Sequence, residues 1–84
     1  MKDIVQEAHG IIREHTAAYM TAIEYLPTSI SELYEDMVDE CAYILSQKFI
    51  DGEYTPMEYN AIRNELGKLL WNLFEEPIHA ELNA

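Results

Sequence analysis

The chain has 84 residues, about half of a common domain length of ~150, so we expect a single domain over residues 1–84. Five Lys and Arg residues against sixteen Asp and Glu residues give a net charge of −11. This charge disfavours direct binding to nucleic acid or to an anionic membrane, because both would repel the chain. A single cysteine excludes an internal disulfide and a multi-cysteine zinc site. Together with the absence of a long apolar run, it favours a cytoplasmic protein.

Proline and glycine divide the sequence into three stretches with helical apolar periodicity. Pro27 follows the first stretch, Asp51-Gly52 follows the second, and Pro77 is expected to end the third. We therefore predict an all-α fold, an up-down-up three-helix bundle with short connections, in which the residues after Pro77 either form a short extra turn or fray. The expected helices cover approximately residues 3–26, 29–50 and 56–75.

The start of each expected helix carries a capping signature, in which a hydroxyl or carboxylate residue precedes Glu or Gln by three positions. The three pairs are Asp3 with Gln6, Ser29 with Glu32, and Thr55 with Glu58. Pro56 strengthens the third signature, since proline is well suited to the first position of a helix.

The first helix has one apolar face with His15 in its middle. The other residues of this face are Ile4, Ala8, Ile11, Ala18, Tyr19, Ala22, Ile23 and Leu26. His15 is either an imidazole packed in a core or interface, or a metal ligand or catalytic base. A metal ligand or catalytic base would need further ligating or catalytic side chains nearby. Neither paired Glu-x-x-His nor His-Glu-x-x-His spacing occurs in the sequence. We therefore expect no metal, no cofactor and no catalytic residue.

The second helix has an inward face centred on Cys41. The other members of this face are Ile30, Leu33, Tyr34, Met37, Ile44, Leu45 and the stem of Lys48. No histidine or cation is near Cys41 in the sequence, so we expect a packed, inert thiol and not a reactive one.

Opposite this face lies a group of carboxylates that we call the acidic face: Glu32, Glu35, Asp36, Asp39 and Glu40. Tyr43 falls within the same arc. Lys and Arg are absent from residues 14–47, so the nearest cation on the same helix is Lys48, eight residues after Glu40. Carboxylates one turn apart repel each other by ~0.2–0.5 kcal/mol per pair. The acidic face is either a solvated surface or, as the missing cations suggest, a surface for a basic partner.

The segment 51–58 resembles the second half of an EF-hand calcium loop, with Asp51 and Gly52 at the turn and Glu58 as the last ligand. Gln47 and Phe49 stand where the first and third ligands would be, and phenylalanine offers no oxygen. The segment also resembles the turn of short helical hairpin modules at the C-termini of bacterial proteins. We expect a capped structural turn.

The third helix packs its leucine-rich face inward: Tyr59, Ile62, Leu66, Leu69, Leu70, Leu73 and Phe74. Trp71 points elsewhere, one turn after Gly67, where the missing side chain would leave a notch beside the indole. Trp71 either folds over Ile78 or Leu82, or serves as an anchor for another protein.

Taken together, these features indicate a small acidic, non-enzymatic protein-binding module. In this interpretation it is an inhibitor or regulator that docks on a basic surface of a target protein, for example a surface that binds nucleic acid. Acidic inhibitors from phages and mobile elements are similar in size and charge. The expected contact residues are Glu32, Glu35, Asp36, Asp39, Glu40, Tyr43 and Trp71. The alternative is a homo-oligomeric module that uses the apolar face of the first helix or the Trp71 notch.

Overall fold

The computed structural model describes residues 3–22 and 29–83, with only the backbone given for 18–22. It contains three helices, α1 (Ile4–Ala22), α2 (Ile30–Ile50) and α3 (Pro56–Leu82), and each packs against the other two. The all-α three-helix bundle is thus confirmed. The prediction that the first helix continues over 23–26 lies outside the described residues. None of the described helices has the length and apolar character needed to cross a membrane.

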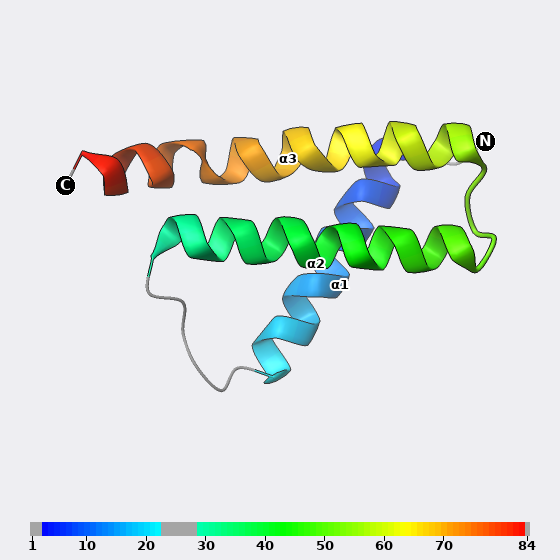
Figure 1. Cartoon of the computed structure of the whole chain (residues 1–84), viewed down its shortest axis with the longest axis horizontal. Helices are drawn as coiled ribbons and strands as arrows, with labels where there is room; N and C mark the ends of the chain where they lie inside the picture. Colours follow the sequence, from blue (N-terminus) through cyan, green and yellow to red (C-terminus); the bar gives the residue numbers. More distant parts are fainter. Residues whose placement is uncertain (1–2, 23–28, 84) are drawn as a thin grey trace.

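α2 and α3 lie side by side as an antiparallel hairpin, and α1 crosses this pair obliquely (Figure 1). A helix that crosses others at an angle contacts them over a short stretch. In α1 this stretch is marked by Ala8, Ile11 and His15, which are buried and follow one another at three- and four-residue spacing. Ala8 is completely inaccessible, and its small side chain lets the helices approach closely at the crossing.

The core lies where the three helices meet. Besides Ala8 and Ile11, its buried members are Cys41, Leu45, Tyr54, Ile62, Leu66 and Leu70. Tyr54, in the turn between α2 and α3, donates a hydrogen bond to the Glu7 carboxylate of α1 at 2.8 Å. This bond fastens the start of α1 to the turn and satisfies the one polar atom that the buried ring carries.

The α2–α3 turn is closed by backbone and side-chain hydrogen bonds. Gly52 takes a positive φ of 83°, and the N–H groups of Gly52 and Glu53 donate to the carbonyls of Phe49 and Lys48. These are the two bonds of a Schellman motif. Thr55 and Glu58 then form the predicted capping box, each accepting a hydrogen bond from the backbone N–H of the other. The expectation of a capped structural turn is therefore confirmed.

The prediction that the third helix ends at Pro77 is wrong, because α3 continues to Leu82. A proline inside a helix costs ~3 kcal/mol or more, since it removes one backbone hydrogen bond and crowds the preceding turn. The extension brings Glu81 to the first residues of α2. There its carboxylate accepts hydrogen bonds from the backbone N–H of Ile30 and from the hydroxyl of Ser31. A carboxylate at a helix N-terminus is favoured by unpaired N–H groups and by the helix dipole.

We expect Glu81→Ala to lower the free energy of unfolding by about 1–2 kcal/mol, because it removes both hydrogen bonds and the charge from the start of α2. Chemical denaturation followed by circular dichroism measures this loss. The matched control is Glu76→Ala, which removes the same charge from an exposed position of the same helix. Equal stabilities of the two variants would contradict a capping role for Glu81.

The expectation that Leu73 faces the core is also wrong, because its side chain is 58% exposed. The other predicted inward residues of α3 are buried or half-buried. The reason is the oblique course of α1, which meets α3 in its first half and leaves the second half uncovered on that side (Figure 1). Helical periodicity identifies a face, but it does not tell how far along the helix a neighbour covers that face.

Candidate functional site

The acidic face lies on the outer surface of α2, as predicted. Glu35, Asp36, Asp39 and Glu40 are exposed, whereas Glu32, in the first turn of the helix, is half-buried. Tyr43 lies among these residues with 62% of its surface exposed. The N-cap of α2 sets the start of the helix that carries these residues. The Ser29 hydroxyl accepts a hydrogen bond from the Glu32 N–H at 3.0 Å and thereby fixes where the helix begins.

In the part of the chain that the structure describes, no Lys or Arg side chain pairs with the four exposed carboxylates of this face. In residues 3–22 and 29–83, ion pairs join Lys48 to Glu14 at 3.5 Å and to Glu53 at 4.0 Å, and none reaches the four exposed carboxylates. Lys48 lies at the C-terminal end of α2 and pairs there with one carboxylate of α1 and one of the turn. Arg13, Arg63 and Lys68 are exposed on the other two helices. Four carboxylates consequently face the solvent along about one and a half turns of α2.

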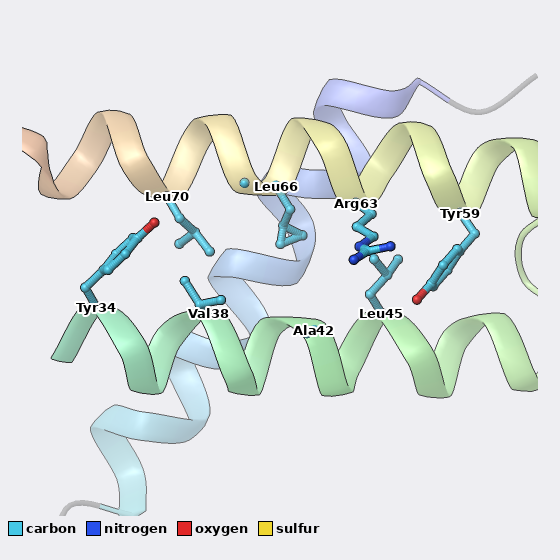
Figure 2. Close-up of a pocket in the computed structure, with 9 residues that line it drawn as sticks. Tyr34, Val38, Ala42, Leu45, Tyr59, Arg63, Leu66 and Leu70 are labelled. Carbon is cyan, nitrogen blue, oxygen red and sulfur yellow. The ribbon is translucent and has the colours of Figure 1, made fainter. Parts of the chain in front are cut away.

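Beside the acidic face, a groove of about 280 Å³ runs between α2 and α3 (Figure 2). Its lining residues are Tyr34, Val38, Ala42, Leu45, Tyr59, Arg63, Leu66, Gly67 and Leu70. Tyr34 and Tyr59 lean across the space from opposite helices at its two ends, while α1 lies behind the hairpin. We call this feature the α2–α3 groove.

Trp71 lies at the Tyr34 end of the groove and links the two helices. Its ring is edge-on to Tyr34, with ring centres 5.8 Å apart, and lies 6.4 Å from the His79 ring. The side chain remains 39% exposed. Leu82, which the sequence offered as one cover for Trp71, is itself 73% exposed. The indole is therefore partly held by α2 and partly open to solvent.

The two side chains that could have carried chemistry are both buried. Cys41 is fully inaccessible, and burial together with the neighbouring Glu40 carboxylate raises its thiol pKa to about 11. A thiol with this pKa is protonated at neutral pH and is a poor nucleophile, as expected. His15 is 7% exposed and belongs to the packed face of α1. Among the described residues, no three His, Cys, Asp or Glu side chains are grouped so that they could hold a metal ion.

Sequence reasoning found the acidic face and Trp71 but not the groove that connects them. The available signal was the pair of small residues Ala42 and Gly67, one on each helix. On the sequence alone, Gly67 indicates only a notch beside Trp71. Ala42 and Gly67 line the same groove because α2 and α3 are packed side by side, and no local sequence pattern contains this placement.

Comparisons with protein-family models, with curated proteins and with solved structures found no match to this chain.

Proposed function

We propose that this protein is a small non-enzymatic binding module that docks the acidic face of α2 on a basic surface of a target protein. In its most specific form, the carboxylates occupy cationic side chains that would otherwise hold a nucleic-acid backbone, so the protein acts as an inhibitor or regulator. Tyr43 and Trp71 add aromatic contacts to the charged ones, as is common at protein interfaces.

The observation that carries this proposal is the row of four exposed carboxylates on α2, which form no ion pair with any residue that the structure describes. Repulsion between carboxylates one turn apart is a standing cost in the free protein. Lys and Arg side chains of a partner would relieve it, and the net charge of −11 would speed the encounter. A surface selected for solubility alone usually mixes both signs of charge.

The test reverses the charges at Asp36 and Glu40, which lie one turn apart on α2. Asp36→Lys/Glu40→Lys replaces one like-charged pair by another, so we expect little change in helix stability. Target capture from host lysate, followed by binding measurements with the captured protein, should give at least a ~10-fold weaker affinity for the variant and a smaller salt dependence.

The matched control is Glu75→Lys/Glu76→Lys, which makes the same change of charge at two exposed positions of α3. The control should bind more tightly than the α2 variant. If both variants bind as the unmodified chain does, with their folds intact, the acidic face does not contact the target.

The alternative function is self-association as a structural module, and one observation favours the groove over the apolar face of α1 as its surface. Ala8 and Ile11, on the apolar face of α1, are already covered by α2 and α3 within one molecule. The open end of the groove at Trp71 is a surface that a second copy could reach, because the indole there is partly exposed. Sedimentation over a range of concentrations distinguishes the alternatives, because the charge-docking proposal needs no dimer.

A further inference from the structure

We propose that the α2–α3 groove receives an amphipathic basic helix of the target protein, with apolar side chains in the groove and Lys or Arg side chains against the acidic face. This inference depends on the function proposed above and specifies the chemistry of the partner. It corresponds to a common mode of recognition, in which a helix lays its apolar face into a hydrophobic groove.

The lining of the groove is mostly apolar, and Arg63 is its one charged side chain. Leu45, Leu66 and Leu70 form buried parts of the lining, whereas Ala42 and Gly67 are exposed on the two helices above them. A Cβ atom added at Gly67 would meet nothing within 4 Å, so the space above this residue is open. A small residue on each of the two helices that line the groove allows a third helix to approach both α2 and α3 closely.

The ends of the groove are already fixed in place. Tyr34 packs on Phe74 with ring centres 5.3 Å apart, and Tyr59 packs on Phe49 at 4.7 Å. From Tyr34 to Leu45 the α2 wall spans ~16 Å, or about three helical turns. This length suits a helix with anchors at i, i+4 and i+7, because those side chains cover two turns.

Charge identifies the kind of helix that fits. Ala42 lies three residues after Asp39 and seven after Glu35, so these exposed carboxylates border the groove along α2. The α3 wall instead contributes Arg63. A partner helix would therefore place its cations along α2, beside Glu35 and Asp39, which form no ion pair within residues 3–22 and 29–83, and its apolar side chains between the two walls.

The probes are three ~18-residue helical peptides that carry lysines beside a central row of alanine, leucine or phenylalanine, and a scrambled peptide of the same composition for each. Trp71 is the only tryptophan of the chain and lies at the groove, so its fluorescence reports binding when the peptides contain none. We expect at least one amphipathic peptide to bind about tenfold or more tightly than its scrambled counterpart.

Two variants locate the bound helix. Gly67→Gln extends a neutral side chain over the open part of the groove and should weaken binding about tenfold without harming α3, since Gln favours helix more than Gly does. Glu35→Gln/Asp39→Asn should weaken binding and reduce its salt dependence, whereas Glu75→Gln/Glu76→Gln should do neither.

Three results would overturn the inference. Equal binding of amphipathic and scrambled peptides, unaffected by Gly67→Gln, would mean that charge alone attracts them. Failure of all three amphipathic peptides to bind would exclude this occupant. A dimer of the free chain that Gly67→Gln abolishes would show that a second copy fills the groove. The proposed function is judged separately by Asp36→Lys/Glu40→Lys, because neither position lines the groove.

Discussion

Truncation of Ile62 to alanine is expected to lower the free energy of unfolding by about 2–5 kcal/mol. Ile62 is fully buried and belongs to the cluster where α3 meets α1 and α2. The variant therefore loses apolar burial and leaves a cavity at the crossing of all three helices. A domain of 84 residues has a total stability of only ~4–12 kcal/mol, so this loss should unfold a large part of the population on mild heating.

The matched control is Leu73→Ala, on the same helix and with a similar change of volume. Helical periodicity alone would assign Leu73 to the core, whereas the structure leaves it 58% exposed. We therefore expect the control to lose less than about 1 kcal/mol. Urea unfolding of the two variants measures the difference, and losses of similar size would mean that α1 covers more of α3 than the structure shows.

The stability of the protein should fall as the pH rises above about 9. Folding raises the thiol pKa of Cys41 from 9.0 to about 11. Burial of the thiol is the larger cause, and the neighbouring negative charge of Glu40 is the smaller one. In this range the unfolded chain has released its proton while the folded chain still binds one. The protonated Cys41 thiol thus contributes fully to the free energy of unfolding below pH 9. This contribution, about 3 kcal/mol, is lost as the pH approaches 11. The pKa of Tyr54 shifts on folding in the same direction. Burial and the hydrogen bond to Glu7 raise it above the ordinary 10.0.

Urea unfolding between neutral pH and about pH 11 tests this window. Cys41→Ala should be less stable than the unmodified chain at neutral pH, because of the cavity, but should lose less stability as the pH rises. Tyr54→Phe should remove the part of the stability loss that begins above about pH 10, where an unfolded tyrosine releases its proton. The differences between the three proteins isolate these two groups from other alkaline effects. Parallel pH profiles would contradict the assignment to Cys41 and Tyr54.

The sequence was sufficient wherever the deciding contacts are local. The capping residues Asp3, Ser29 and Thr55 each accept a backbone N–H three positions later, as their spacing predicts. The inward positions of α2 and the outward acidic face likewise follow from helical periodicity. These features depend on residues within one or two turns of each other, and such residues can be compared directly in a linear sequence.

The sequence was insufficient where the deciding contact spans the chain. Pro77 is a good local signal for the end of a helix, but α3 continues because Glu81 can reach the start of α2, about fifty residues away in sequence. Leu73 is exposed because of the direction that α1 takes. The α2–α3 groove arises from the relative position of two helices, and its small residues become meaningful only once that position is known.

The hydrogen bonds at both ends of α2 have a consequence for recognition. At its start the helix is held by Ser29 and by the Glu81 carboxylate, and at its end by the two backbone bonds of the turn. Side chains on such a helix have a fixed backbone spacing before any partner arrives. Association then costs little conformational entropy on this side, since only side-chain rotamers have to be restricted. Most of the adaptation between the two molecules would therefore take place in the partner.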